Sequence, residues 1–447
     1  MPTVISSSAS EIRKIVNCKS SNRTYLLAIH FTPSTPVISD LTLHLKHSNL
    51  PQEQQTEVRG TFFPAEWHPQ SGVQLTWPHV QTDWADLLPA VEDCFVSIAL
   101  EIFAHDELLL IVTPEPDRIQ RLLRERLPAR LLPCIRYFEC PTNDTWARDH
   151  AFLTLLTGDG PRLLDYCFNG WGNKFPAELD NAINRKLKLL SNSSRREEES
   201  TSCGYTSGNE ALPPKGGDEE GFLHGIYEPH LDFVFEGGSI ESDGHGTLMT
   251  TSACLLSPNR NPHLNRQQIE ERLLHDLHAD RLLWLDHGYL AGDDTDSHID
   301  TLARFCPNGT IAYVQCTDPA DEHYEALRAM EQQLRSFEPA GFPSEKASPA
   351  ATSEAHSYRL IPLPLPSPIY DPDDGHRLPA TYANFLIINR AVLLPTYGQP
   401  DNDELARRQL QKAFPKYDII PIDCRVLIRQ HGSLHCSTMQ YPVGVMV

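Results

Sequence analysis

Apolar residues recur every three to four positions between residues 83 and 103, which predicts an amphipathic helix with Asp83 as its N-cap. The continuous apolar run at 108–113 predicts a buried strand directly after that helix. The further expected helices span 117–127, 177–190, 266–277, 322–336 and 403–413, and the further strands span 73–77, 134–139, 151–156, 282–285 and 311–314. This repeated alternation of helix and strand predicts a single α/β architecture.

Three segments lack the pattern. Residues 1–57 are rich in Ser, Thr, Asn, Gln and His without a sustained period, so we expect a poorly ordered extension. Residues 192–221 contain almost no large apolar residue and residues 338–356 are rich in Pro, Ala and Ser, so both are predicted to be disordered surface insertions. The remainder, 58–447, is expected to form a single domain that carries the chemistry.

Charge and cysteine usage narrow the class of protein. The chain has 38 Lys and Arg against 59 Asp and Glu, a net charge of −21, which argues against nucleic acid or an anionic membrane as partner and favours a small cationic substrate. Its 11 cysteines are scattered without a C-x-x-C pair, which favours reduced thiols and argues against a structural zinc site. Without a convincing signal peptide or a run of about 20 apolar residues, a soluble cytoplasmic protein is expected. A homo-oligomer is compatible with the sequence.

Residues 291–300 concentrate four carboxylates and one histidine. In an extended segment alternate residues point the same way, so Asp296, His298 and Asp300 are expected to face one pocket. A histidine beside carboxylates can hold or pass a proton near neutral pH. A calcium loop is an alternative, but the sixth-position glycine and twelfth-position glutamate of an EF-hand are absent, and a zinc site with His287 lacks histidines at helical spacing. No metal is therefore expected.

Three other short motifs have residue types suited to chemistry. Asp149 ends Thr-Asn-Asp-Thr-Trp-Ala-Arg-Asp between two expected strands, although alone this motif reads as a capped turn with a surface ion pair. Glu236 follows the apolar strand 233–235 and precedes two glycines, where the backbone turns sharply or approaches something closely; the alternative is a hairpin, which the Asp-Gly pair at 243–244 is expected to form. Cys436 has polar neighbours that do not suit a core cysteine, so it is a candidate nucleophile.

Eight motifs follow one another in a fixed order: Pro-Ala-Glu-Trp at 64–67, Thr-Trp-Pro at 76–78, Asp-Thr-Trp-Ala-Arg-Asp at 144–149, Phe-Asn-Gly-Trp-Gly at 168–172, Glu-Gly-Gly-Ser-Ile at 236–240, Pro-Asn-Arg-Asn-Pro at 258–262, Gly-Asp-Asp-Thr-Asp-Ser-His-Ile-Asp at 292–300 and Leu-His-Cys at 434–436. Together they resemble the agmatine deiminase and bacterial-type peptidylarginine deiminase family of the guanidine-modifying superfamily. The resemblance spans about residues 60–442. It implies a pentein fold, a five-bladed, pseudo-symmetric α/β propeller of ββαβ units with its catalytic site on the central axis.

The resemblance also implies a role for each candidate residue and no metal or organic cofactor. A guanidinium is a planar cation that two carboxylates can hold through paired, charge-assisted hydrogen bonds. The implied roles are nucleophile for Cys436, general acid and base for His298, orientation of that histidine for Glu236, the guanidinium grip for Asp149 and Asp300, and walls around the substrate's methylene chain for Trp146 and Trp171.

The implied reaction is hydrolysis of the guanidinium group of agmatine to N-carbamoylputrescine and ammonia through a covalent amidino-cysteine, a step towards putrescine and polyamines. Deimination of peptidyl or free arginine to citrulline is the alternative, and a non-catalytic cation-binding protein is less favoured. The sequence departs from the family pattern at Ser297, where a glycine is usual, and at 432–441, where Gly-Ser-Leu-His-Cys-Ser-Thr-Met-Gln-Tyr replaces Gly-Gly-Asn-Ile-His-Cys-Ile-Thr-Gln-Gln. These departures concern the far end of the pocket, while the acidic chain without an export signal favours agmatine.

Overall fold

The computed structural model describes residues 13–20, 23–30, 37–38, 60–188, 222–339 and 357–447. Most of the expected N-terminal extension and nearly all of both expected insertions lie outside these residues, so the predictions of disorder stay predictions. Within the extension, three strands form an antiparallel sheet of their own: β1 (Arg13–Ser20), β2 (Arg23–His30) and β3 (Val37–Ile38).

Five further small sheets contain the other named strands that the structure describes. Four of them have three strands each, in the orders β7–β8–β9, β10–β11–β12, β13–β14–β15 and β16–β17–β18, and the fifth has the order β19–β4–β5–β6. In every one of these sheets the first pair is antiparallel and the following pairs are parallel. A tight turn can join two antiparallel strands, whereas two parallel strands need a longer crossover connection. Each sheet contains both kinds of strand pair. The fold is therefore mixed α/β, as predicted.

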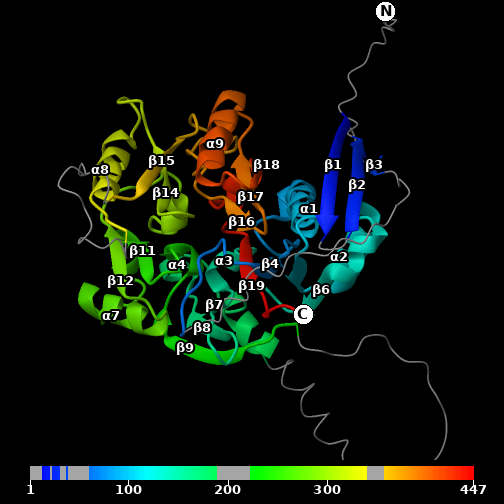
Figure 1. Ribbon diagram of the computed structural model, residues 1–447, viewed down its shortest axis with the longest axis horizontal. Coiled ribbons are helices and arrows are strands. Elements are labelled where there is room, and N and C mark those ends of the chain that lie inside the picture. Colours follow the sequence, from blue (N-terminus) through cyan, green and yellow to red (C-terminus); the bar gives the residue numbers. More distant parts are fainter. Residues whose placement is uncertain (1–12, 21–22, 31–36, 39–59, 189–221, 340–356) are drawn as a thin grey trace, which may run out of the picture.

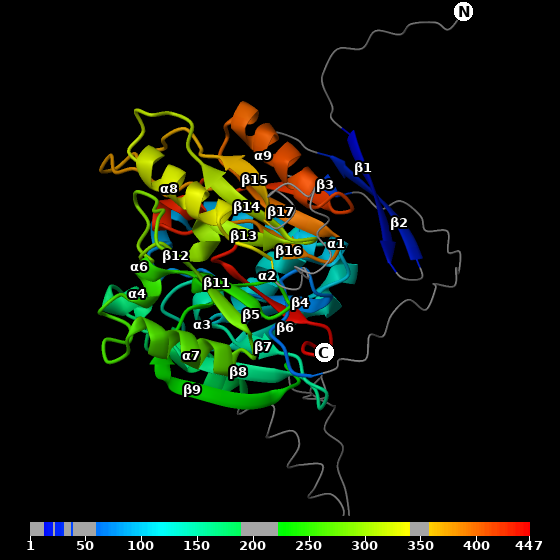
Figure 2. The ribbon, with the colours of Figure 1, turned by 60° about the vertical axis from the view of Figure 1, so that its left-hand side comes forward.

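The four-stranded sheet joins distant parts of the chain. Its strands are β4 (Gln70–Thr76), β5 (Leu108–Thr113), β6 (Ile135–Glu139) and β19 (Thr438–Pro442). The others are β7 (Leu153–Leu155), β8 (Arg162–Cys167), β9 (Ile226–Val234), β10 (Glu241–Ser242), β11 (Thr247–Thr251), β12 (Arg281–Leu285), β13 (Ala303–Cys306), β14 (Thr310–Gln315), β15 (Arg359–Pro364), β16 (Leu386–Ile388), β17 (Ala391–Thr396) and β18 (Asp418–Asp423). In Figures 1 and 2, β19 lies beside β4, so the last strand of the chain pairs with a strand near residue 70.

The longer helices lie where the apolar periodicity predicts them. They are α1 (Leu88–Ala104), α2 (Pro116–Arg126), α7 (Arg266–Asp276), α8 (Tyr324–Arg335) and α9 (Pro400–Ala413), and Figure 1 shows α7, α8 and α9 at the periphery. Asp83 is not the N-cap of α1: a 3-10 turn at Ala85–Leu87 comes first, and α1 starts with a proline in its first turn and no side-chain cap. Proline lacks an N–H and is preset for a helical first turn, which explains the later start.

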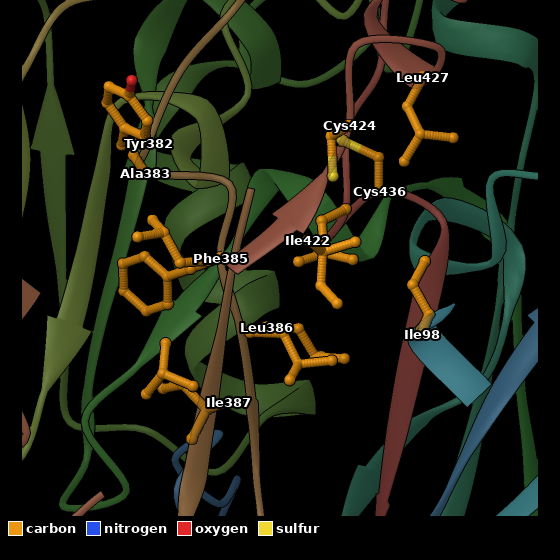
Figure 3. Close-up of a cluster of buried hydrophobic side chains, with 14 of the residues drawn as sticks. Ile98, Tyr382, Ala383, Phe385, Leu386, Ile387, Ile422, Cys424, Leu427 and Cys436 are labelled. Atoms are coloured by element: carbon orange, nitrogen blue, oxygen red, sulfur yellow. The ribbon is translucent and has the colours of Figure 1, made fainter. Parts of the chain in front are cut away.

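Two apolar clusters fill the interior between sheets and helices. Figure 3 shows part of the larger one, in which Phe385, Leu386 and Ile422 from the sheet β16–β17–β18 and its edge lie near Ile98 from α1. Cys436 belongs to the same cluster and is labelled in the same view. The candidate nucleophile therefore lies at the edge of the core, despite its polar neighbours in sequence. Among the helices that the structure describes, none is both long and apolar enough to cross a membrane.

Candidate active site

Each of the five sheets contributes one segment to the candidate site, and each segment comes just before the first strand of its antiparallel pair. Because these strands begin at corresponding places, side chains far apart in sequence come together. In chain order the segments carry Asp149 in α3 (Ala147–His150) before β7, Glu236 beside η4 (Gly237–Ser239) before β10, His298 and Asp300 at η5 (Ile299–Thr301) before β13, Asn384 before β16, and Cys436 before β19.

Cys436 is buried, with 6% of its surface exposed. Its Sγ lies 3.2 Å from Nδ2 and 3.4 Å from Oδ1 of Asn384, and 3.8 Å from Oδ2 of Asp300. Burial raises the pKa of the thiol well above its ordinary value, and the negative charges of Asp300 and Asp149 raise it further. In the unliganded site Cys436 is therefore an un-ionised thiol at neutral pH.

Asp149 and Asp300 are the carboxylates beside this thiol, and neither pairs with an arginine or lysine among the described residues. Asp149 accepts hydrogen bonds from the Gly238 N–H and the Trp171 Nε1–H, both at 2.9 Å. Oδ2 of Asp300 lies 2.8 Å from Nδ1 of His435, while Oδ1 has no hydrogen-bond partner in the described chain. Two buried carboxylates without an arginine or lysine between them are complementary to a guanidinium.

The two carboxylates differ in their ionisation. Burial raises the pKa of Asp149 to about 6, because a charged carboxylate is poorly solvated there. Burial acts in the same direction on Asp300, but the hydrogen bond from His435 and the positive groups nearby outweigh it, and the pKa of Asp300 lies below its ordinary value. Asp300 is therefore the more firmly ionised member of the pair.

His298 is fully buried next to Asp149. Its Nδ1 lies 3.7 Å from Oδ1 of Asp149, and its Nε2 lies 4.0 Å from Oε2 of Glu236. Burial lowers the pKa of the ring, but Asp149, the neighbouring Cys254 and Glu236 raise it more, to about 10. The imidazole therefore carries its proton at neutral pH and can give it to a leaving group.

Gly238 lies where three of these side chains converge. A β-carbon at this position would sit 2.7 Å from Nδ1 of His298, 2.8 Å from Oδ1 of Asp149 and 3.2 Å from Oδ2 of Asp300. Any side chain here would displace groups that the site needs. The glycine is thus part of the shape of the site.

The adjacent Gly237 is required for a similar reason, since a β-carbon on it would collide with the carbonyl oxygen of Arg148. Neither glycine of the pair has a positive φ angle, so close approach of the backbone explains them and a hairpin does not. The expected tight turn lies further on, at Gly244, whose φ is 73°.

Glu236 is held by Arg260, an arginine that the sequence analysis did not single out. The Nε of Arg260 lies 2.9 Å and 3.0 Å from the two carboxylate oxygens, and both side chains are fully buried. Other N–H groups of Arg260 donate to Asp296 at 2.6 Å and to the carbonyl oxygen of Thr295 at 2.8 Å. No hydrogen bond joins Glu236 to His298, so its role in orienting that histidine stays a prediction.

Residues 291–300 do not form the extended segment that their alternation predicts. Asp296 and Ser297 have left-handed backbone conformations, with φ angles of 63° and 65°. The turn directs Asp296 to Arg260 and Lys174, so the expectation that it faces the candidate pocket is wrong. Glycine adopts a left-handed backbone conformation with less strain than other residues. This gives a physical reason for the glycine that is usual at the position of Ser297 in the family that the sequence resembles.

Cys436 and Asp149 line a pocket of about 440 Å³, called here the substrate pocket. The side chains of Trp146 and Trp171 line it. The lining includes four carboxylates and neither lysine nor arginine. Its other residues are Asp83, Asp144, Phe175, Asp294, Thr295, Gln430, His431 and Gly432.

A model of the Porphyromonas-type peptidyl-arginine deiminase family matches residues 62–442. The chain belongs to this family. A curated relative, the agmatine deiminase of Stutzerimonas stutzeri, is 30% identical in an alignment of 405 positions that covers 86% of this chain and 96% of the relative.

Two solved structures of similar proteins cover nearly the same part of this family member. A Porphyromonas gingivalis protein described provisionally as an arginine deiminase is 45% identical with a TM-score of 0.72, and the match covers 87% of this chain and 100% of that one. A C. jejuni agmatine deiminase with substrate bound is 33% identical with a TM-score of 0.68, over 88% of this chain and 98% of that one.

Three residues of the candidate site in this deiminase family member were not singled out in the sequence analysis. Asn384, whose Nδ2 lies 3.1 Å from Oδ2 of Asp300, occupies in the fourth sheet the place that Cys436 occupies in the last. The shared topology identifies it, but the repeats have no residue identity that would show this beforehand. Arg260 lies inside the Pro-Asn-Arg-Asn-Pro motif, and an arginine among family motifs is a signal for a carboxylate partner. His435 gives no separate signal beside the cysteine.

Two groups of described residues bring ligand atoms within 4.8 Å of one another, as a metal ion would need: Glu236, Cys254 and His298, and Glu66, Glu241 and His435. In both groups an arginine already neutralises the carboxylates. Arg260 holds Glu236, and Arg304 holds both Glu66 and Glu241. A guanidinium therefore supplies the positive charge that a metal ion would otherwise bring.

Proposed function

We propose that this deiminase family member hydrolyses the guanidinium group of agmatine to N-carbamoylputrescine and ammonia. The observation that carries the proposal is the pair Asp149 and Asp300, buried carboxylates without an arginine or lysine partner in the described chain, beside the thiol of Cys436. A substrate guanidinium would complete this pair with charge-assisted hydrogen bonds. The names of the S. stutzeri relative and the C. jejuni structure support the same activity.

Binding of the substrate changes the ionisation of Cys436. Asp149 and Asp300 keep the pKa of its thiol high in the free enzyme, together with burial. A guanidinium between the two carboxylates neutralises their charge and lowers the pKa of the thiol, so the thiol releases its proton to solvent water as the substrate binds and takes one back when the product leaves. The thiolate then faces the central carbon of a group held in one orientation, which favours attack.

The chemical steps need only the cysteine, the histidine and water. Sγ of Cys436 bonds to the guanidinium carbon, the bond from that carbon to one terminal nitrogen breaks, and His298 protonates the nitrogen that leaves as ammonia. The covalent amidino-cysteine is then attacked by water, whose proton passes to the neutral imidazole. The C–S bond breaks and Cys436 departs as thiolate, while the remaining hydroxyl proton of the adduct passes to solvent as the ureido product forms. In solvent this proton converts the ammonia released earlier to ammonium.

The tail of the substrate decides between agmatine and arginine. Asp83 and Asp294 line the substrate pocket, which contains neither lysine nor arginine for an α-carboxylate. The aromatic faces of Trp146 and Trp171 suit a methylene chain and a terminal ammonium. Asp144 contributes less, because its oxygens already accept hydrogen bonds from indole N–H groups and burial raises its pKa to about 6.

A second candidate is deimination of arginine in peptides, or of free arginine, to citrulline. The description of the matching family and the provisional name of the P. gingivalis structure favour it. His431, which lines the substrate pocket 3.6 Å from Asp294, offers a group that a substrate carboxylate could meet.

Ammonia release measured with agmatine, free arginine and an arginine-containing peptide separates these candidates. We expect kcat/KM for agmatine to exceed the other two by roughly 100-fold, since a buried like-charge contact costs several kcal/mol. Turnover of the peptide with agmatine inert would overturn the agmatine assignment, and ammonia from none of the three would overturn deimination. Cys436→Ser should abolish ammonia release and keep agmatine affinity, whereas a protein that only binds cations would show no turnover before the change.

We infer further that the five sheets are the blades of a five-bladed α/β propeller and that residues 58–447 form one catalytic domain. The shared antiparallel-then-parallel order of the sheets supports this inference. So does the position of the site segments, each before the first strand of a different sheet. In a ring of this kind the five segments meet at the axis.

A further inference from the structure

His435 is the neighbour of the nucleophile, and both of its ring nitrogens are engaged. The histidine is buried and lines a second pocket, of about 580 Å³, whose lining also includes Glu66, Arg148 and Glu241. Its Nδ1 lies 2.8 Å from Oδ2 of Asp300. Its Nε2 faces the other way, 2.9 Å from Oε2 of Glu66. The ring therefore connects the second pocket with the carboxylate that lies beside Cys436.

The charge on Asp300 places a proton on Nδ1 of this ring. An ionised carboxylate can only accept, so Nδ1 must donate to Oδ2 of Asp300. Nε2 lies between two groups of opposite character: Nη2 of Arg304, a donor at 3.0 Å, and Oε2 of Glu66, an acceptor to which Arg304 also donates. Burial lowers the pKa of His435, and the positive charges of Arg148 and Arg304 lower it further, so the ring is neutral at neutral pH.

The Nδ1–H of His435 consequently points at Asp300. Together with Nδ2 of Asn384 at 3.1 Å, it occupies Oδ2 of the carboxylate and leaves Oδ1 without a partner in the described chain. Two fixed donors on one oxygen set the plane of the carboxylate and favour its charged form. The other charged and titratable groups that act on Asp300 are His298, Arg304, Asp149, Cys436 and Arg148.

We propose that His435 is a positioning residue: its Nδ1–H holds Oδ2 of Asp300 and leaves Oδ1 free for the substrate guanidinium. The inference rests on the proposed function, because it assigns Asp300 to the guanidinium. It adds a hydrogen bond from His435, which lines the second pocket, to the carboxylate beside the nucleophile.

Two substitutions of equal polarity separate this role from mere packing. In His435→Asn the side-chain amide can place its N–H where Nδ1 lies, whereas in His435→Gln the amide reaches the position of Nε2 and leaves Asp300 without that donor. For the glutamine variant we expect kcat/KM to fall roughly 10- to 100-fold, the effect of one lost charge-assisted hydrogen bond. The loss should be greater at pH 6 than at pH 8.5, because the pKa of Asp300 rises when the donor is removed. The asparagine variant should keep the pH profile of the unaltered enzyme.

Binding of agmatine to the same variants in a Cys436→Ser background, measured by calorimetry across pH, keeps the two hypotheses apart. If the unaltered enzyme binds agmatine but does not turn it over, the proposed function is overturned. The role of His435 is then tested by the pH dependence of agmatine binding alone. Identical pH profiles for the asparagine and glutamine variants would overturn the role of His435. The role of His435 would also be overturned if the loss of kcat/KM had the same size at every pH, or if agmatine binding were absent from all variants. Thermal unfolding of both variants shows whether either substitution acts through stability alone.

Discussion

Two pairs of carboxylates lie on opposite sides of the Leu-His-Cys segment, and they differ in how their charge is balanced. In the second pocket, Glu66 and Glu241 both accept hydrogen bonds from the fully buried guanidinium of Arg304. Beside the substrate pocket, Asp149 and Asp300 have no arginine or lysine partner among the described residues. The first pair thus has a guanidinium between its two carboxylates, whereas the second has none and has only the protonated ring of His298, 3.7 Å from Asp149.

The difference indicates what each pair does. A buried ion pair that is already complete holds its surroundings in place, and removing one member leaves an uncompensated charge. A pair of buried carboxylates whose charge is only partly balanced is costly in the free protein, and a ligand that supplies a further cation recovers this cost as binding energy. Arg304 therefore shows, within the chain itself, how two carboxylates hold a guanidinium, and the proposed substrate would bring the equivalent group to Asp149 and Asp300.

The largest effect is expected from Gly238→Ala, which fills the point where the carboxylates and His298 converge. The new β-carbon would lie under 3 Å from Nδ1 of His298 and Oδ1 of Asp149, so one of them must move. We expect kcat/KM for agmatine to fall by roughly 100-fold or more, because displacements of this size misalign the reacting groups. Gly158→Ala is the matched control, since nothing lies within 4 Å of a β-carbon there. Equal activity of the two variants would contradict the arrangement.

Arg304→Met tests the completed pair and should act on stability. Both glutamates would lose their buried partner, and we expect the free energy of unfolding to fall by roughly 3–5 kcal/mol in urea titrations. Arg335→Met is the control, because the ion pair of Arg335 with Glu331 lies on an exposed helix surface and should contribute less than about 1 kcal/mol. A similar loss in both variants would mean that Arg304 is no more important than a surface arginine.

The pH dependence of kcat/KM should reveal Asp149. Its pKa is raised to about 6 by burial, and only its ionised form attracts a guanidinium. Activity should therefore fall as the pH drops through about 6, approaching roughly tenfold per pH unit below it. Trp171→Phe removes a hydrogen bond that lowers this pKa, so the fall should move to higher pH. An acid limb near the ordinary aspartate value, or one that Trp171→Phe leaves in place, would show that Asp149 does not control it.

A smaller effect is expected on the reactivity of the thiol. Asp300→Asn removes a negative charge 3.8 Å from Sγ of Cys436, so the pKa of the thiol should fall and its alkylation by iodoacetamide at pH 7.5 should accelerate roughly tenfold, although turnover is lost. Glu66→Gln, which removes a charge from the second pocket, should leave the rate nearly unchanged. Mass spectrometry of the labelled peptide identifies the thiol. Slower labelling of the Asp300→Asn variant would contradict the assigned effect of this carboxylate.

The positions of most helices and strands could be predicted from the sequence because they depend on local apolar periodicity. His298 and Asp300 were predicted to lie in one site, and they do, although the backbone that presents them is a left-handed turn and not a strand. The same turn sends Asp296 away to Arg260, and no alternation pattern contains that information. Asn384 and His435 act through contacts with residues 84 and 135 positions away, and such contacts exist only after the sheets have assembled.

The pairing of β19 with β4 has a consequence for how an active molecule arises. Tyr441 in β19 donates a hydrogen bond to Gln74 in β4, 367 positions earlier, and Cys436 lies just before β19. Contacts between residues so far apart in sequence form late in folding, because closing such a long loop costs the chain entropy before the contacts stabilise it. During synthesis, the carboxylates and the histidine can assemble while the thiol is still elsewhere. Ammonia release would then serve as a direct signal that β19 has paired with β4, and slow pairing would appear as a lag in activity on refolding.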